Sequence, residues 1–240
     1  MIEFFNVSKL YPGNSPGIVD VSVKISDGEF VFLIGPSGSG KTTLLRLLIR
    51  DLLPTTGTIT VDTIGVGSLS AKTAYTLRRK IGIVFQDFKL LVDRTVYENV
   101  SLVSEILGKP YQEIEKGVMN VLDLVGLSDK RNHFPVQLSA GEMQRVAIAR
   151  AIVGGPTILL ADEPTGNLDP QTADGIWDIL EEIHGLGTTV IIATHNQDAV
   201  NKMKKRTLIL ERGVLTSDEA KGKYHVTKHE KHGSKGGEHK

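Results

Sequence analysis

The stretch Gly35-Pro36-Ser37-Gly38-Ser39-Gly40-Lys41-Thr42 fits the pattern G-x-x-x-x-G-K-[ST] of a phosphate-binding loop. Its glycines let the backbone turn so that successive N–H groups converge on phosphate oxygens. In such a loop Lys41 reaches the β- and γ-phosphates, and the hydroxyl of Thr42 coordinates Mg²⁺. A flexible Gly/Ser turn with an incidental lysine is the alternative. The stretch predicts a nucleotide site that ends at Thr43, on the first turn of a helix.

The sequence around this loop places it between a strand and a helix. The apolar run 30–34 precedes it and a helical pattern over 43–48 follows, which is the context that the pattern requires. Two further apolar runs, 158–161 and 190–193, are bounded by polar or turn residues and predict buried strands of a parallel sheet. Together these segments predict an α/β fold.

Strands of a second kind are predicted near the N-terminus, over 2–7 and 18–25. Apolar and polar residues alternate in the second of these segments, which suits a half-exposed antiparallel strand. We therefore expect an antiparallel part beside the parallel core.

Two helical regions are predicted between the loop and the second apolar run. Apolar residues recur at three- and four-residue spacing over 95–127, and Lys109-Pro110 breaks this stretch in two. Residues 139–153 predict another helix, because Ser139 and Glu142 have the spacing of a capping box.

The composition excludes several classes of protein. Lys+Arg and Asp+Glu both number 28 among 240 residues, so we expect no specific nucleic-acid partner. The absence of cysteine excludes disulfides, thiolate nucleophiles and Cys-ligated metals. No run approaches the ~20 apolar residues that span a bilayer, and the N-terminus has no signal-peptide pattern. We expect a cytoplasmic chain whose membrane role would need a partner.

Two acids end the second apolar run. Asp162 and Glu163 would lie at the carboxyl end of a parallel strand, where α/β folds place ligand chemistry. Asp162 is suited to hold Mg²⁺, and Glu163 to polarise an attacking water as general base. The alternative is that two acids simply end a strand and begin a loop.

Two more polar residues follow predicted strands. His195 comes after 190–193 and could hydrogen-bond the γ-phosphate or the attacking water, although a histidine there is often structural. Gln86 follows Ile83-Val84-Phe85 and could ligate Mg²⁺ and sense the γ-phosphate, or cap a loop. Both are candidate catalytic residues beside Glu163 and Lys41.

The order of these motifs resembles the nucleotide-binding domain of ATP-binding-cassette (ABC) proteins, over about residues 1–213. In chain order the motifs are the phosphate loop, Gln86, Leu138-Ser139-Ala140-Gly141-Glu142, Asp162-Glu163, Asn167-Leu168-Asp169 and His195. The resemblance implies a P-loop NTPase of ABC type. Its mixed sheet core would carry an antiparallel β subdomain and a helical signature subdomain, inserted at about 87–150.

The resemblance also assigns roles. It implies that Tyr11 stacks on the adenine of ATP and that residues 138–142 are the ABC signature, so that Ser139, Ala140, Gly141 and Glu142 contact nucleotide. Two chains would form a head-to-tail homodimer on binding Mg-ATP, each signature closing on the γ-phosphate held by the other chain. The loop at Asp169 would cross between the two sites. A membrane partner would be driven by this cycle and would hold the ATPase on the inner face of the membrane. Residues 87–99 are the candidate contact, and packing within the helical subdomain is the alternative for this segment.

Two positions depart from the family pattern. The third signature position is usually glycine and is Ala140 here, so its Cβ could crowd the phosphate. Glu142 replaces the commoner glutamine. Weakened closure of the dimer is the expected consequence.

Within the family, Val84-Phe85-Gln86-Asp87-Phe88-Lys89-Leu90-Leu91 resembles the ATPases of bacterial cell division. Lipoprotein-release and macrolide-export ATPases share much of the remaining pattern and are the alternative. A nucleotide-gated adaptor with little hydrolysis is a second alternative. Chromosome-maintenance ATPases are disfavoured, because the interval between Lys41 and Ser139 has no room for their coiled coil.

The last part of the chain has a different composition. Residues 216–240 hold six lysines, four acids and four of the seven histidines. We therefore predict an ATPase domain over 1–213 and a disordered His/Lys-rich tail over 214–240. The tail histidines could bind metal, or the tail could be a solvated extension attracted to anionic lipid.

Overall fold

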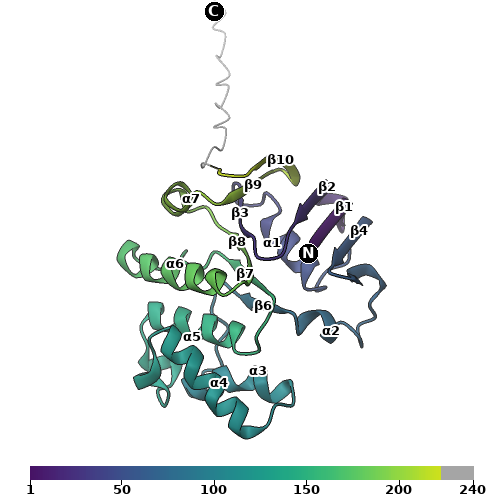
Figure 1. The fold of residues 1–240 in the computed structure, drawn as a ribbon. Coiled ribbons are helices and arrows are strands. Elements are labelled where there is room, and N and C mark those ends of the chain that lie inside the picture. The colour runs from purple at the N-terminus through teal and green to yellow at the C-terminus, as the bar shows by residue number, and fades with distance from the viewer. Residues whose placement is uncertain (223–240) are drawn as a thin grey trace, which may run out of the picture.

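The computed structural model describes residues 1–222, and its centre is a six-stranded sheet of order β10-β9-β3-β8-β7-β6 (Figure 1). The strands are β3 (Phe30–Ile34), β6 (Ile81–Val84), β7 (Ile158–Asp162), β8 (Thr189–Ala193), β9 (Arg206–Glu211) and β10 (Val214–Glu219). The five strands from β9 to β6 are parallel to one another, and β10 is antiparallel to β9. The buried parallel strands predicted from three apolar runs are β3, β7 and β8, so that prediction is confirmed.

A second, antiparallel sheet has the order β2-β1-β4-β5 and lies to one side of the first (Figure 1). It consists of β1 (Ile2–Tyr11), β2 (Ser15–Ile25), β4 (Thr56–Val61) and β5 (Ile64–Gly65). Strands β1 and β2 are longer than the predicted segments, and β1 pairs with both β2 and β4. This is the antiparallel part expected beside the parallel core.

Seven α-helices occur in the described residues. They are α1 (Lys41–Leu48), α2 (Tyr75–Arg78), α3 (Val96–Ile106), α4 (Tyr111–Leu124), α5 (Ala140–Ile152), α6 (Pro170–Gly185) and α7 (Gln197–Met203). Helices α3, α4 and α5 gather at the end of the molecule away from β10 (Figure 1). The predicted break at Lys109-Pro110 is confirmed, and so is the capping box that begins α5 at Ser139.

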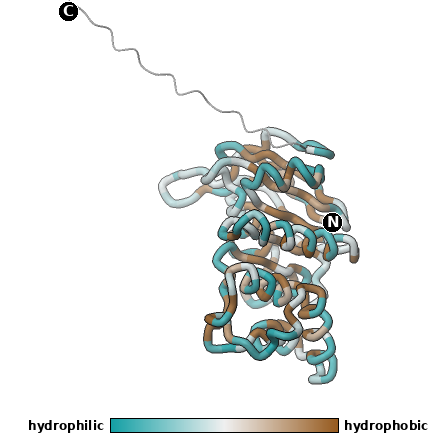
Figure 2. The backbone as a smooth tube through the Cα atoms, turned by 90° about the vertical axis from the view of Figure 1, so that its left-hand side faces the viewer, coloured by the Kyte–Doolittle hydropathy of each residue, from teal (hydrophilic) through white to brown (hydrophobic). Residues whose placement is uncertain are grey.

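Strand β3 holds the two faces of the core together. Phe32 and Ile34 belong to a cluster that includes apolar residues of α3 to α6, whereas Val31 and Leu33 belong to a cluster with α1 and the antiparallel sheet. All four side chains are fully buried. Figure 2 shows apolar segments, in brown, running through the inside of the body. Because β3 leads directly into the phosphate loop, this double packing fixes where the loop begins.

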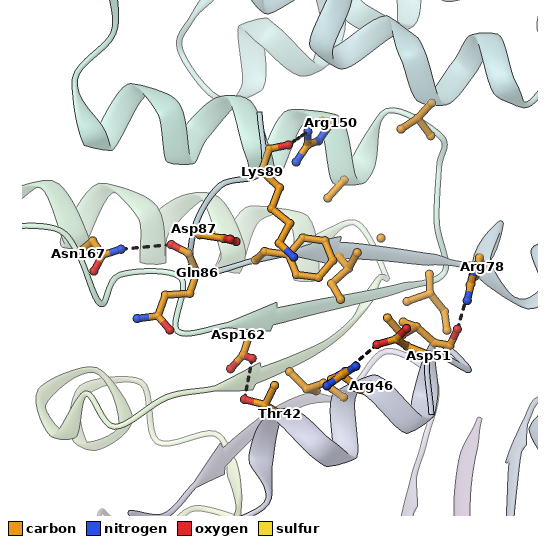
Figure 3. Close-up of a pocket in the computed structure, with 18 residues that line it drawn as sticks. Thr42, Arg46, Asp51, Arg78, Gln86, Asp87, Lys89, Arg150, Asp162 and Asn167 are labelled. Carbon is orange, nitrogen blue, oxygen red and sulfur yellow. Dashed lines mark hydrogen bonds and ion pairs between the residues drawn. The ribbon is translucent and has the colours of Figure 1, made fainter. Parts of the chain in front are cut away.

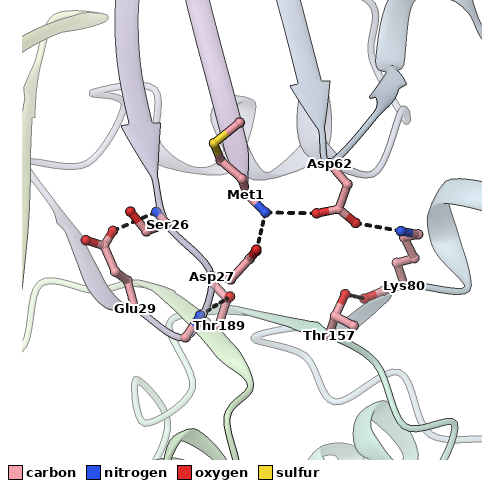
Figure 4. A network of polar contacts seen from close by, with 9 residues as sticks. Met1, Ser26, Asp27, Glu29, Asp62, Lys80, Thr157 and Thr189 are labelled. Atoms are coloured by element: carbon pink, nitrogen blue, oxygen red, sulfur yellow. Dashed lines mark hydrogen bonds and ion pairs between the residues drawn. The ribbon is translucent and has the colours of Figure 1, made fainter.

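An ion-pair network joins the antiparallel sheet to the central sheet (Figure 4). Asp62 lies in the turn between β4 and β5 and pairs with Lys80 at 2.5 Å, just before β6. It also accepts a hydrogen bond from the amino group of Met1 at 2.8 Å, and that amino group contacts Asp27. The hydrogen bond from Lys80 contributes most to lowering the pKa of Asp62.

The predicted tail boundary at residue 214 is wrong. Residues 214–219 form β10, an antiparallel edge strand on β9. Arg212 and Gly213 both have positive φ, 50° and 85°, as a two-residue hairpin turn requires, so they join two strands instead of ending the domain. The rest of the predicted tail from residue 223, with its histidines, lies outside the described residues. Within residues 1–222, no helix has the length and apolarity needed to cross a membrane.

Candidate functional site

The phosphate loop turns through conformations that favour glycine. Gly40, directly before α1, has φ 108°, and a Cβ there would lie 2.4 Å from the carbonyl oxygen of Gly17. A Cβ on Gly35 would lie 2.1 Å from the carbonyl oxygen of Leu210. The loop therefore packs closely against neighbouring backbone and presents the N-terminus of α1 to the space in front of it.

Lys41 is folded back over this loop. Its Nζ donates to the carbonyl oxygens of Gly35 at 2.8 Å and Pro36 at 3.2 Å. Burial lowers the pKa of Lys41, and the nearby Glu163 and Asp162 oppose that shift. The hydroxyl of Ser39 is buried in the same loop without a hydrogen-bond partner among the described residues. The ammonium group of Lys41 and the unpartnered hydroxyl of Ser39, both in one glycine-rich loop, fit a bound phosphate.

Thr42 and Asp162 meet across the floor of the site. The Thr42 hydroxyl donates to Oδ2 of Asp162 at 2.8 Å. Burial raises the pKa of Asp162, and the like charge of Glu163 raises it further. A hydroxyl, a carboxylate and the nearby amide of Gln86 are the oxygen ligands that Mg²⁺ prefers. These residues fit a divalent cation, which would also relieve the cost of the buried carboxylate.

Glu163 and His195 form a pair at the carboxyl ends of β7 and β8. Nδ1 of His195 lies 2.8 Å from Oε1 of Glu163, and the backbone N–H of His195 donates to Oε2 at 3.3 Å. The Glu163 side chain is 13% exposed and that of His195 67%. Glu163 has φ 49°, in the left-handed region, and its N–H donates to the carbonyl of Ala193 at 2.8 Å. Such strain is common where a side chain must be aimed for chemistry.

The predicted aromatic residue lies at the rim. The hydroxyl of Tyr11 is 3.0 Å from that of Thr43, on the first turn of α1. A Cβ on Gly17 would lie 2.7 Å from the Tyr11 ring, so the ring packs against bare backbone. This packing places the aromatic ring beside the phosphate loop.

These groups enclose a cavity of about 640 Å³, a volume typical of small-ligand sites. It brings together the following predicted residues: Tyr11, Ser37, Gly38, Ser39, Gly40, Lys41, Thr42, Thr43, Gln86, Asp162, Glu163 and His195. Ser15, Pro16 and Gly17 also line it and were missed by the sequence analysis. The turn-rich run directly after Tyr11 was the available signal.

The predicted signature residues lie elsewhere. Ser139 and Glu142 cap the start of α5, where Ser139 N–H donates to Oε2 of Glu142 at 2.8 Å and Glu142 N–H donates to Ser139 Oγ at 3.3 Å. The backbone bond from Ser139 is the first cause that lowers the pKa of Glu142. Asp169 caps α6 through a 3.0 Å bond from Thr172 N–H. None of these residues lines the nucleotide cavity, and neither do Ala140 and Gly141.

A larger cleft of about 1170 Å³ adjoins the nucleotide cavity (Figure 3). Thr42, Gln86 and Asp162 line both spaces. Figure 3 shows Lys89 and Arg150 on the helical side of the cleft and Arg46 on the side of α1. Gln86 thus lies between a space that fits a nucleotide and one open toward the helical end of the molecule.

Comparisons with known proteins place these features in a family. Residues 18–166 match the ABC transporter family. The chain is 48% identical over 224 residues to the cell division ATP-binding protein FtsE of Bacillus subtilis, covering 93% of this chain and 98% of that one. It is 50% identical over 225 residues to the FtsE of Mycobacterium tuberculosis, with the same coverage, and 45% identical over 215 residues to that of Escherichia coli K12, with 90% and 97% covered.

Solved structures agree with this match. An ATP-binding cassette solved as a dimer in a post-hydrolysis state, with bound ADP and Pi, superposes with a TM-score of 0.84 at 35% identity. The match covers 93% of this chain and all of that one. The cbiO1 component of an ABC transporter complex from Clostridium perfringens gives a TM-score of 0.85 at 32% identity, with 91% and 88% covered.

Proposed function

Because the chain belongs to the ABC transporter family of ATP-binding proteins, we propose that it is the ATPase subunit of a bacterial cell-division machine, similar to FtsE. The observation that carries ATP hydrolysis is the pairing of Glu163 with His195 in the cavity that also holds Lys41 and Thr42. The similarity to FtsE over nine-tenths of the chain supports the role in division.

The residues of the cavity divide the work of ATP hydrolysis. Lys41 and the N–H groups of the phosphate loop bind the β- and γ-phosphates and neutralise their charge. Thr42, Asp162 and Gln86 would hold Mg²⁺, which would supply further charge neutralisation. Tyr11 stacks on the adenine.

Glu163 and His195 act on the water. Glu163 accepts a proton from a water whose oxygen bonds in line to the γ-phosphorus. The bond from that phosphorus to the bridging oxygen breaks at the same time, which gives ADP and inorganic phosphate. Partial burial of Glu163 and its contact with His195 hold the carboxylate in one orientation. His195 is exposed enough to reach the γ-phosphate at the mouth of the cavity.

A second copy of the chain completes the site. Ser139, Ala140, Gly141 and Glu142 lie at the N-terminus of the 13-residue helix α5, whose dipole and free N–H groups suit an anion. They lie outside the cavity of their own chain, so they are available to close on the γ-phosphate of a partner chain. Asp169 lies at the crossing loop. The related dimeric cassette bound to ADP and Pi supports this arrangement.

The partner that uses this motion is an integral membrane protein, an FtsX-like permease. The cleft of Figure 3 supports this, because Gln86 lines it together with Asp87 and Lys89. These two residues lie in the first part of the segment 87–99 that we assign to partner contact. The chain would then be cytoplasmic and peripheral on the inner face of the membrane. We assign no specific nucleic-acid partner.

Depleting the chain in its host should give long undivided cells, whereas loss of a lipoprotein-release or macrolide-type exporter would leave division intact.

Ala140 keeps a second candidate open, a nucleotide-gated adaptor with little hydrolysis. Steady-state phosphate release by wild type, Glu163→Gln and Glu182→Gln separates the two. Glu182 is an exposed acid on α6 and is the matched control. We expect Glu163→Gln to slow release about 100-fold or more, because a general base contributes on that order, and Glu182→Gln to match wild type. A wild type as slow as Glu163→Gln would favour the adaptor.

A further inference from the structure

The turn after β6 has an uncommon backbone. Phe88 and Lys89 have φ 56° and 48°, and within the described chain they are the only two consecutive non-glycine residues in the left-handed region. The turn is tight, since Lys89 N–H donates to the carbonyl of Asp87 at 2.5 Å. A bulky aromatic residue and a lysine adopt this conformation only against steric resistance from Cβ, so something must hold them there.

The group that holds them is Arg150. Its Nη1 donates to the carbonyl of Lys89 at 2.6 Å and its Nη2 to the carbonyl of Phe88 at 2.7 Å, as Figure 3 shows for Lys89. One planar guanidinium thus binds the carbonyl groups of both left-handed residues, and these bonds are short because the donor is charged. Burial lowers the pKa of Arg150, so its charge is held inside the protein and directed at these two oxygens.

We call the two hydrogen bonds from Arg150 to Phe88 and Lys89 the clamp, and this clamp lies at a junction of the fold. Gln86, which lines both the nucleotide cavity and the cleft, is two residues from Phe88, and its carbonyl accepts a 3.3 Å bond from Asn167. Arg150 lies in the last turn of α5, the helix whose first turn is capped by Ser139. Two charged hydrogen bonds therefore join the last turn of α5 to the turn after β6.

We propose that Arg150 is a positioning residue for ATP turnover: it holds Phe88 and Lys89 in the left-handed conformation, which keeps Gln86 facing the nucleotide cavity and couples it to α5. The proposal rests on the proposed function for the part that concerns turnover. The clamp itself rests on the geometry of the turn.

The test compares Arg150→Met with Arg145→Met in the full chain. Arg145 lies on the same helix, but its Nη1 donates to the carbonyl of Val125 at 2.9 Å, away from the turn. We expect Arg150→Met to lower kcat for ATP about fivefold and to change KM less than about twofold, because the phosphate loop is untouched. Amide exchange over 86–90 should become about tenfold faster in Arg150→Met, and stay at the wild-type rate in Arg145→Met.

Glycine at position 89 separates a clamp from general packing. Lys89→Gly accepts the left-handed conformation without a Cβ, so the turn needs Arg150 less. Arg150→Met combined with Lys89→Gly should therefore recover at least about half of the kcat of Lys89→Gly alone. Arg145→Met leaves the turn in place, so combining it with Lys89→Gly should give the kcat of Lys89→Gly alone.

In the turnover measurements, two results would overturn the proposal: an Arg150→Met chain with wild-type kcat, or a loss of kcat that Lys89→Gly leaves in place. The exchange measurement needs no ATP. A wild-type chain that hydrolyses no ATP would therefore refute the proposed function alone, whereas unchanged exchange over 86–90 in Arg150→Met would refute the clamp.

Discussion

The nucleotide cavity and the predicted signature surface both carry groups suited to phosphate, but only the first is enclosed by its own chain. In the cavity, Lys41, Asp162 and Glu163 are held by contacts from several elements and are partly or wholly buried. At the start of α5, Ser139 is exposed; its N–H and hydroxyl bond to Glu142, and its carbonyl accepts from the N–H of Met143. In the function that we propose, this difference means that one chain binds a nucleotide, while hydrolysis requires a second chain to bring its signature surface.

The largest expected effect is on ATP binding, the step that the nucleotide cavity performs before hydrolysis. Lys41→Ala should weaken ATP binding roughly 100-fold, because hydrogen bonds to a charged group contribute about 1.5–3 kcal/mol and the phosphate also loses its nearest cation. Equilibrium titration with a fluorescent ATP analogue measures this. Lys116→Ala, on the exposed face of α4, is the control. Affinity within about threefold of wild type would show that the cavity binds phosphate by other means.

A substitution on the other surface should spare binding and stop turnover. Ser139→Arg places a bulky cation where the signature would meet the partner's phosphate, so we expect phosphate release to fall roughly 50-fold while one chain binds ATP as before. The capping bond is lost too, at a cost of about 1 kcal/mol in stability. Weaker ATP binding by the single chain would contradict the separation of the two regions.

The buried carboxylate of the cavity should cost stability. Burial raises the pKa of Asp162, so its ionised form destabilises the nucleotide-free chain fully above the raised pKa and not at all below the ordinary pKa of an aspartate. Asp162→Asn should therefore raise Tm by about 3 °C at pH 7, and the gain should shrink as pH falls through the raised pKa and be gone below the ordinary one. Thermal unfolding at several pH values measures it. A gain that persists at low pH would assign the effect to another cause.

The smallest expected effect concerns the unusual signature residue. Ala140→Gly removes the Cβ that would face the partner's phosphate, and we expect ATP turnover to rise about threefold. Ala140→Ser keeps a Cβ and should give no rise. Equal rates in wild type and both variants would mean that this position lies away from the phosphate.

Local patterns in the sequence predicted the features that neighbouring residues determine. The phosphate loop between β3 and α1 follows from 30–48, because a buried strand, glycines and a helical pattern adjoin there. The start of α5 follows from the spacing of Ser139 and Glu142 alone.

Other features depend on distant parts of the chain. The clamp joins Arg150 to Lys89 and Phe88, which lie 61 and 62 positions earlier in the chain. No local pattern indicates either this pairing or the left-handed turn. Strand β10 was predicted as tail because the lysines and histidines beyond it dominate the average composition of the segment. Its pairing with β9 is a property of the sheet edge, where Arg212 and Gly213 form the hairpin turn between the two strands.

The central claim is that the nucleotide cavity of one chain is completed by the signature surface of a second chain. Sedimentation in the presence of ATP tests this claim most directly. The Glu163→Gln chain should bind ATP without hydrolysing it and sediment as a dimer, whereas the same chain with ADP should sediment as a monomer. Adding Ser139→Arg should return the ATP-bound chain to a monomer. An ATP-bound Glu163→Gln chain that stays monomeric at all concentrations, or a dimer indifferent to Ser139→Arg, would contradict the account.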